Sequence, residues 1–341
     1  MTEPLLPPGH PPIKTPKVGL LLMNLGTPEA TDYWSMRRYL KEFLSDRRVI
    51  EVNRWLWWPI LNLVILTFRP RKSGHAYKAV WNIEKNESPL KTFTRGQSEK
   101  LSKILTNPKL IVDWAMRYGK PPVAERLAAL QDQGCDRIVL FPLYPQYSAA
   151  TTATALDKAY DALKTMRWQP AIRTVPPYFD HPAYIDAIAE SLKTHVASLN
   201  WQPDRILLAF HGLPREYLDK GDPYHCHCQK TARLVREKLG YSKDFAQIVF
   251  QSRFGPAEWL QPYAQETVEN LAAEGVKNLL MISPGFSSDC VETLEELSIG
   301  LQETFHEKGG VNFSVVPCLN DSAISLKLLA LLANEELKGW A

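Results

Sequence analysis

The chain has 341 residues, enough for two domains of ordinary size or one large α/β unit. Apolar residues make up 45% and charged residues 23%, which is the composition of a soluble globular protein. The net charge of +3 is the balance of 40 basic and 37 acidic side chains, so nucleic-acid binding is not expected.

Cysteine usage indicates the compartment. The chain has five cysteines, an odd number: Cys135, Cys226, Cys228, Cys290 and Cys318. No basic region followed by an apolar core stands at the N-terminus, so no signal peptide is expected. We therefore expect a reducing compartment, the cytoplasm, and no disulfide framework.

Two segments near the N-terminal end of the chain stand out from the rest. Residues 1–16 contain six prolines and are expected to form a flexible, extended arm. A second, apolar segment, W-L-W-W-P-I-L-N-L-V-I-L-T-F, begins at Trp55, ends at Phe68 and is followed by R-P-R-K. It is too short to span a bilayer. It is either an interior helix or an exposed apolar lip, suited to touching a membrane surface or admitting an apolar ligand.

Short β-type runs alternate with longer helical patterns along the rest of the chain. Strands are expected at residues 18–23, 137–141, 205–210, 248–251, 278–282 and 313–316. Helices are expected at residues 123–131, 183–198, 229–239, 259–274 and 322–337. This alternation predicts an α/β fold with largely parallel sheets covered on both faces. Its strand-end loops should gather at one edge, where ligands of such folds bind.

The chain also resembles itself. L-M-N-L-G-T-P at residues 22–28 is similar to L-A-F-H-G-L-P at 208–214, and residues 134–142 are similar to 275–284. Two matched pairs predict two similar lobes with a shared cleft. We expect the lobes at residues 17–168 and 169–320, with a final helix at 321–341 packing back on the first lobe.

The candidate site begins with His211, which follows a buried strand directly. A neutral imidazole in such a place can accept a proton or bind a transition metal near neutral pH.

A second candidate feature is the helix expected after residue 288. At about 100° per residue, Glu292, Glu296 and Glu303 fall within about 40° of one another, with Asp289 close by. The opposite side carries an apolar stripe of Leu294, Leu297, Leu301 and Phe305. The carboxylates are either a solvated face or a path for a divalent cation or for protons.

Three further features have simpler interpretations. H-C-H-C, from His225 to Cys228, has metal-ligand spacing but lacks a second cluster, so structural metal binding is not favoured. Cys290 is expected to be a packing group. Arg117, followed by Tyr118, is either a partner for a ligand carboxylate or a plain surface arginine.

Three longer motifs resemble one family. They are F-H-G-L-P-x-x-x-x-x-x-G-D-P-Y from residue 210, Q-S-R-F-G-P-x-x-W-L from 251 and S-P-G-F-S-S-D-C-V-E-T-L-E-E-L from 283. With L-L-M-N-L-G-T-P-E, S-D-R-R-V-I and F-P-L-Y-P-Q-Y-S earlier in the chain, they make it similar to the ferrochelatases from about residue 18 to the final helix.

The resemblance implies two Rossmann-like lobes and a lyase that inserts Fe2+ into a porphyrin, the last step of heme synthesis. His211 matches the family's active-site histidine and Glu292 the glutamate facing it, both as catalytic and as metal-contacting residues. Glu296 and Asp289 would form the path for protons or metal. The positions matching porphyrin contacts are Leu25, Tyr77, Arg117, Tyr118, Trp259 and Phe286. The resemblance also favours the exposed interpretation of the apolar lip.

Some positions depart from animal members of the family. Those hold an iron–sulfur cluster through a cysteine-rich tail and a cysteine after Y-P-Q-Y-S, where this chain has Ala149. Cys290 and Gly300 replace a histidine and an acid. We expect no iron–sulfur cluster and no permanently bound cofactor, with Fe2+ as a substrate.

The sequence thus predicts insertion of Fe2+ into protoporphyrin IX to give protoheme, with release of two protons. Alternatives are a ferrochelatase acting on coproporphyrin, a cobalt or nickel chelatase acting on another tetrapyrrole, and a non-catalytic heme or porphyrin carrier. The expected location is the cytoplasm, with peripheral contact at the inner membrane surface as an additional expectation.

Overall fold

The computed structural model describes residues 7–11 and 13–341. Much of the predicted flexible arm, residues 1–6 and 12, lies outside the described residues. The rest of that segment is exposed, and regular structure begins at Lys17.

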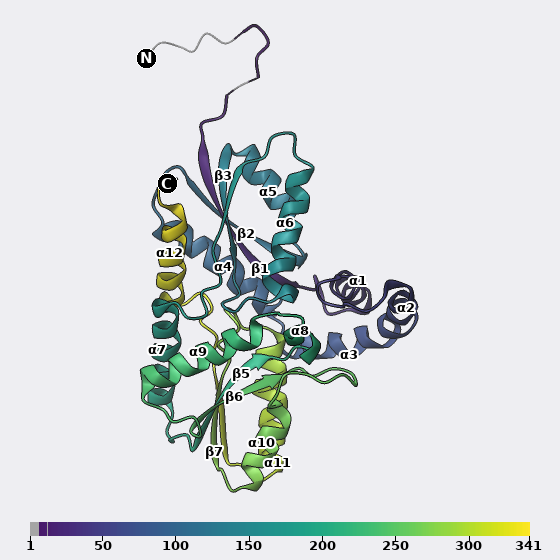
Figure 1. Cartoon of the computed structure of the whole chain (residues 1–341), viewed down its shortest axis with the longest axis vertical. Coiled ribbons are helices and arrows are strands. Elements are labelled where there is room, and N and C mark those ends of the chain that lie inside the picture. Colours follow the sequence, from purple (N-terminus) through teal and green to yellow (C-terminus); the bar gives the residue numbers. More distant parts are fainter. Residues whose placement is uncertain (1–6, 12) are drawn as a thin grey trace.

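Two parallel four-stranded sheets organise the chain (Figure 1). The first contains β1 (Lys17–Thr27), β2 (Leu110–Gly119), β3 (Cys135–Pro142) and β4 (Ala171–Thr174) in the order β2-β1-β3-β4. The second contains β5 (Arg205–His211), β6 (Ala246–Gln251), β7 (Asn278–Ile282) and β8 (Asn312–Val316) in the order β6-β5-β7-β8. The strand order is the same in both sheets, so the predicted pair of similar lobes is confirmed.

Helices cover both faces of each sheet. In the first lobe they are α1 (Tyr33–Leu44), α4 (Pro89–Ile104), α5 (Val123–Asp132), the short wide helix η2 (Ala149–Ala153) and α6 (Thr154–Lys164). The rest of the chain carries α7 (Pro182–Ser198), α8 (Arg215–Asp219), α9 (Tyr224–Leu239), α10 (Ala264–Ala273), the wide helix η3 (Glu292–Leu301), α11 (Gln302–Glu307) and α12 (Ala323–Leu337).

The central strand of each sheet places apolar side chains on both faces. Alternate side chains of a strand point to opposite faces. Leu20 and Leu22 of β1 therefore lie in a core that continues into the second lobe, whereas Leu21 and Met23 lie in a separate core against α5 and α6. The shared core makes the two lobes one packed body.

Two predicted boundaries were wrong. Strand β4 pairs with β3, so the first lobe extends to Thr174, beyond the predicted end at residue 168. The helix predicted from Trp259 begins only at Ala264, because Pro262 lacks the backbone N–H and fixes φ in the segment before it. The final helix was predicted correctly: α12 packs against α4, β3 and α7.

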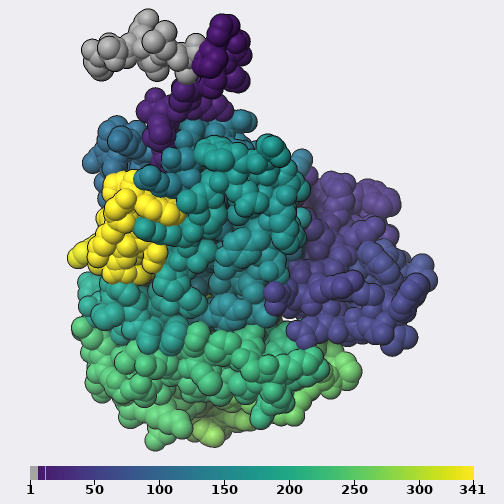
Figure 2. Space-filling view, turned by 45° about the horizontal axis from the view of Figure 1, so that its top comes forward, coloured from purple at the N-terminus to yellow at the C-terminus, as the bar shows by residue number. Residues whose placement is uncertain are grey.

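The apolar segment forms a helical projection from the first lobe, made of α2 (Arg54–Pro59), the wide helix η1 (Ile60–Ile65) and α3 (Leu66–Ala79) (Figures 1 and 2). Leu61 and Leu66 are fully buried and attach it to the lobe, whereas Trp55 is 89% exposed and Leu63 and Phe68 are each 72% exposed. The exposed interpretation of the apolar lip is therefore correct. Among the described residues, none of the helices combines the length and the apolarity needed to cross a bilayer.

Candidate active site

His211 is the last residue of β5 and is half-buried. Its Nδ1 lies 2.6 Å from the carbonyl oxygen of Gly212. A carbonyl oxygen can only accept, so Nδ1 carries the hydrogen and Nε2 keeps its lone pair. Among the described residues nothing forms a hydrogen bond to Nε2. That nitrogen is therefore free to take a proton or to contact a metal ion.

Gly212 allows neighbouring groups to approach the histidine closely. A Cβ atom at this position would lie 2.7 Å from the carbonyl oxygen of Gln251 and 3.1 Å from the indole of Trp259. Any larger residue would force β6 or the indole away. The predicted porphyrin contact Trp259 thus lies directly beside Gly212, the residue that follows the histidine.

The acidic helix is the wide helix η3, which begins at Glu292. Leu297, Leu301 and, in the following α11, Phe305 are buried in the core of the second lobe, as the predicted apolar stripe requires. Glu292 and Glu296 are half-buried on the other side, whereas Glu303 is exposed. Helices of this kind occur often at functional sites.

Glu296 is held by the residue that follows β6. Its two carboxylate oxygens accept hydrogen bonds from the backbone N–H of Ser252, at 2.7 Å, and from its hydroxyl, at 2.5 Å. Burial raises the pKa of the Glu296 carboxyl, against these hydrogen bonds and the nearby His211, while Glu292 adds to the increase. The pairing of His211 with Gln251, and the hydrogen bonds of Gln251 and Ser252 to Glu292 and Glu296, bring both glutamates to the strand end that carries His211.

The first lobe supplies the opposite wall. Tyr39 of α1 and Tyr77 of α3 have ring centroids 6.3 Å apart. Burial raises the pKa of Tyr77 well above its ordinary value, and the charges of Tyr39 and Glu292 add to this. Leu25 packs with Tyr77 on one side and shares a small cluster with Phe286 of the second lobe on the other. Leu25, Tyr77 and Phe286 thus lie where the first lobe meets the second.

Asp289 has a different position from its predicted partners. It is buried, and its carboxylate accepts hydrogen bonds from Thr293, from the backbone of Cys318 and from Asn320, the last at 2.6 Å. All these contacts fix the loop that precedes η3. Cys290 is buried beside Met116, as expected of a packing group.

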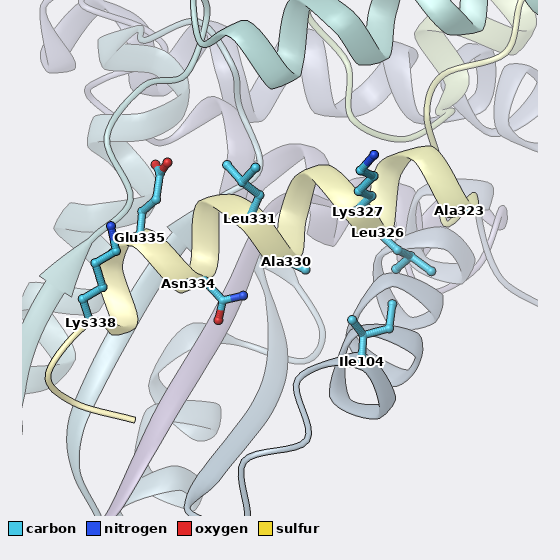
Figure 3. Close-up of a pocket in the computed structure, with 9 residues that line it drawn as sticks. All are labelled: Ile104, Ala323, Leu326, Lys327, Ala330, Leu331, Asn334, Glu335 and Lys338. Atoms are coloured by element: carbon cyan, nitrogen blue, oxygen red, sulfur yellow. The ribbon is translucent and has the colours of Figure 1, made fainter.

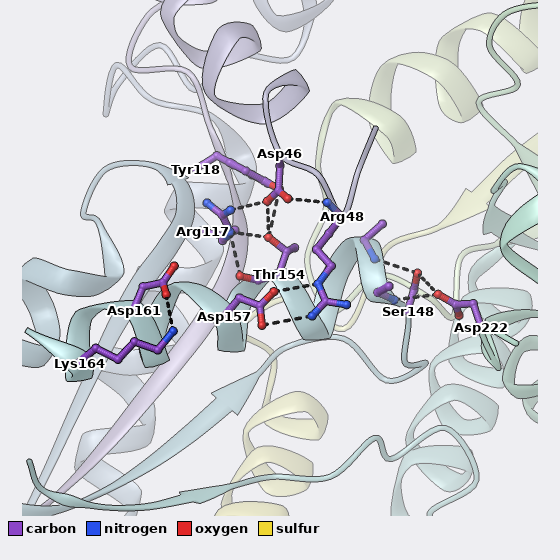
Figure 4. A network of polar contacts seen from close by, with 12 residues as sticks. Asp46, Arg48, Arg117, Tyr118, Ser148, Thr154, Asp157, Asp161, Lys164 and Asp222 are labelled. Atoms are coloured by element: carbon purple, nitrogen blue, oxygen red, sulfur yellow. Dashed lines mark hydrogen bonds and ion pairs between the residues drawn. The ribbon is translucent and has the colours of Figure 1, made fainter. Parts of the chain in front are cut away.

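Arg117 and Tyr118 are not brought to the cleft. The guanidinium of Arg117 pairs with Asp46, and Tyr118, fully buried, donates its hydroxyl to the same carboxylate at 2.8 Å (Figure 4). Thr154 also bonds to both Asp46 and Arg117. Neither interpretation drawn from the sequence, a ligand-pairing or a surface arginine, describes this internal ion pair. Burial acts to raise the pKa of Asp46, but the hydrogen bonds and Arg117 lower it overall.

H-C-H-C lies in the first turns of α9, where successive side chains point in different directions. His225 is stacked on Phe250 and His227 on Phe179, while Cys226 is exposed and Cys228 is buried. Within the part of the chain that the structure describes, no three histidine, cysteine or acidic side chains are grouped to hold a metal ion. The metal-ligand spacing of this motif therefore has no counterpart in space.

Two hollows lie elsewhere on the surface. One, of about 670 Å³, is an apolar groove along α12 that also contacts Ile104 (Figure 3). The other, of about 560 Å³, is polar and lies beside Arg117 and Asp46. Neither is lined by His211 or Glu292. We assign the site to the carboxyl ends of β5 and β6 and the start of η3, because the unpartnered imidazole nitrogen of His211 and the two glutamates lie there.

Comparison with known proteins identifies the family of the chain. The family model described as Ferrochelatase matches residues 17–337. A ferrochelatase from Rhizobium etli is 58% identical over 339 residues, 98% of each chain, and one from Rhizobium meliloti is 58% identical, covering 97% of this chain and 98% of the relative. A solved structure, SirB from Bacillus subtilis with Fe3+, has a TM-score of 0.56 at 12% identity, over 95% of this chain and 96% of that one, and shows the fold alone. The chain belongs to the ferrochelatase family.

Proposed function

We propose that the chain inserts Fe2+ into protoporphyrin IX, giving protoheme and two protons, in the cleft between the lobes. Membership of the ferrochelatase family makes it an enzyme that inserts a metal into a porphyrin. The observation that carries the assignment of residues is the unpartnered Nε2 of His211, close to Glu292 and Glu296.

The reaction requires two pyrrole N–H protons to leave as one Fe2+ enters, so the macrocycle is neutral before and after insertion, and the two positive charges of the iron leave as two protons. In the proposed mechanism, Nε2 of His211 takes a pyrrole proton because the opposite nitrogen is already protonated. The Glu292 carboxylate faces the incoming iron, since a carboxylate attracts a divalent cation. Glu296, beside both, receives protons from the site and passes them on. Asp289 supports the loop that carries this path.

The choice of porphyrin follows from the mouth of the cleft. Leu25, Tyr77 and Phe286 give apolar and aromatic walls, and Arg69 of α3 lies over the ring of Phe254 at 4.6 Å. A flat apolar ring with few carboxylates suits such walls. We therefore favour protoporphyrin over coproporphyrin, and Fe2+ over Co2+ or Ni2+ as the metal inserted.

The apolar lip supports a peripheral membrane contact. Its outer side chains, with Arg71 and Lys72 beside them, combine apolar area and positive charge, which together favour an anionic bilayer surface. This contact would place the cleft where an apolar substrate is dissolved. The proposed location is the cytoplasmic side of the inner membrane.

The proposal includes classification as a lyase, no permanently bound cofactor and no iron–sulfur cluster, with iron only as a substrate. Metal and acid-labile sulfide analysis of the purified protein tests the cofactor statement.

The decisive experiment is an anaerobic absorbance assay of purified protein with Fe2+ and either protoporphyrin IX or coproporphyrin. We expect heme formation that is faster with protoporphyrin, and loss of turnover in Glu292→Gln. Heme that binds tightly to a protein without any insertion activity would instead identify a carrier. Full activity of Glu292→Gln would remove that residue from the site.

A further inference from the structure

The motif Q-S-R-F-G-P begins at the carboxyl end of β6, beside the catalytic strand. Gln251, its first residue, pairs in parallel register with His211 on β5. Ser252 follows it directly. Both residues also reach the acidic helix, although that helix lies about 40 residues further along the chain.

Gln251 fixes the start of the acidic helix. Its side-chain amide donates to the backbone carbonyl oxygen of Glu292 at 3.2 Å. The residue is only 2% exposed, and its own Oε1 has no partner among the described residues. A buried amide oxygen without a hydrogen-bond partner lowers the stability of the folded chain. An apolar side chain at this position would avoid that loss, so we infer that Gln251 serves a purpose other than stability.

Ser252 fixes the second glutamate. Its φ is +65°, a left-handed conformation that a serine adopts at a cost and a glycine would adopt freely. In this conformation its N–H and its hydroxyl point to the same carboxylate, one to each oxygen of Glu296. Glycine would keep the first contact but lose the second.

We propose that Gln251 and Ser252 are positioning residues for metal insertion, which fix both glutamates of the acidic helix relative to His211. This inference rests on the proposed function. Because the two residues lie at the end of the strand next to β5, a single backbone segment sets the spacing between His211 and the two glutamates, all of which belong to the second lobe. A carboxylate displaced by even 1 Å is a poorer partner for a reacting group.

Ser252→Gly tests the hydroxyl without strain. The variant keeps the backbone N–H and relieves the positive φ, which offsets the lost hydroxyl contact, so thermal unfolding should show only a small change in Tm. We expect kcat for Fe2+ insertion to fall about tenfold to hundredfold, as for loss of a hydrogen bond to a charged group. The KM for protoporphyrin should stay within about twofold.

A double-mutant comparison assigns the effect to Glu296. In a Glu296→Gln background, Ser252→Gly should lower kcat much less than it does in the native chain, because contacting residues act non-additively. An equal loss in both backgrounds, or unchanged kcat in Ser252→Gly, would overturn the assignment of Ser252.

Gln251→Glu tests the amide donor with almost no change in volume. It places an acceptor against the Glu292 carbonyl oxygen, and kcat should fall at least tenfold while protoporphyrin still binds. Gln247→Glu, the same change on the same strand but away from the cleft, is the matched control and should be neutral. Equal activity of the two variants would refute the role of Gln251. An inactive native protein would instead refute the proposed function.

Discussion

His211 donates its Nδ1 hydrogen to the carbonyl oxygen of the next residue, Gly212, at 2.6 Å. This short local bond sets both the tautomer and the direction of the ring. The group that orients the imidazole is a neutral carbonyl and not a carboxylate, whose negative charge would favour the protonated ring. The geometry suits a group that must accept a proton and release it again in every turnover.

Replacing the imidazole should separate chemistry from binding. We expect His211→Ala to lower the rate of Fe2+ insertion by at least about a hundredfold, the usual contribution of a positioned acid or base. Protoporphyrin binding, followed by fluorescence, should change little because the walls remain. His306→Ala, on the exposed side of α11, is the matched control. Near-native turnover in His211→Ala would exclude the histidine from catalysis.

The burial of Glu296 should make the stability of the folded chain depend on pH. The pKa of this carboxyl is raised in the folded state from an ordinary value of 4.5, so the folded chain binds its proton more tightly than the unfolded chain. The stability that this proton provides is complete below pH about 4.5 and is lost as the pH rises through the folded-state pKa. Glu296→Gln has no carboxyl group that could ionise, so its stability does not fall for this reason as the pH rises. The difference in Tm, variant minus native, should therefore increase from pH 4 towards neutrality.

The control for this measurement is Glu303→Gln, because Glu303 is exposed on α11. Exposed side chains contribute little to stability, so the Tm of this variant should stay close to that of the native chain. A constant difference for Glu296→Gln as well would show that this carboxyl ionises equally in both states.

The apolar lip should be separable into an outer and an inner side. We expect Leu63→Gln combined with Phe68→Gln to leave the free energy of unfolding within about 0.5 kcal/mol per change, since both side chains are exposed. Sedimentation with anionic vesicles should decrease severalfold. Leu61→Ala, in the same segment but fully buried, should cost about 2–5 kcal/mol. Unchanged vesicle binding in the double variant would contradict the membrane contact.

Breaking the ion pair between Asp46 and Arg117 should lower the free energy of unfolding strongly. Asp46→Asn leaves the nearly buried Arg117 without its countercharge, and we expect a loss of about 3 kcal/mol in urea unfolding. Asp157→Asn breaks the ion pair with Arg48, in which both side chains are 46% exposed, and should cost less than about 1 kcal/mol. Similar losses in the two variants would show that burial does not distinguish these ion pairs.

Much of the fold follows from the sequence because buried parallel strands leave continuous apolar runs. Six of the strands were predicted this way, but β2 and the four-residue β4 were not. Asp113 and Arg117 interrupt the pattern of β2. The structure shows why a strand tolerates them: Asp113 pairs with Arg126 at 2.6 Å, and Arg117 with Asp46. These partners lie in other elements, which local periodicity does not reveal.

In the candidate site, too, some residues can be predicted from the local sequence and others cannot. His211 at a strand end and the spacing of Glu292 and Glu296 can be recognised locally. Ser252 was missed, because its role depends on a left-handed backbone and on a partner 44 positions away. In the sequence it stood directly after a predicted strand and within Q-S-R-F-G-P, a motif that was used only for the family resemblance. The burial of Arg117 could not be predicted either, since Asp46 reaches it from a distant loop.

The lip is fixed to the first lobe by few groups: Trp57 donates its indole N–H to the carbonyl oxygen of Leu44 at 2.8 Å, and Leu61 and Leu66 fill the space beneath. Its outward side chains take no part in this attachment. Substitutions of these side chains can therefore adapt the lip to another bilayer or another donor of substrate without changing the metal-inserting site. Exchange of this surface between relatives should transfer their attachment preference without transferring their chemistry.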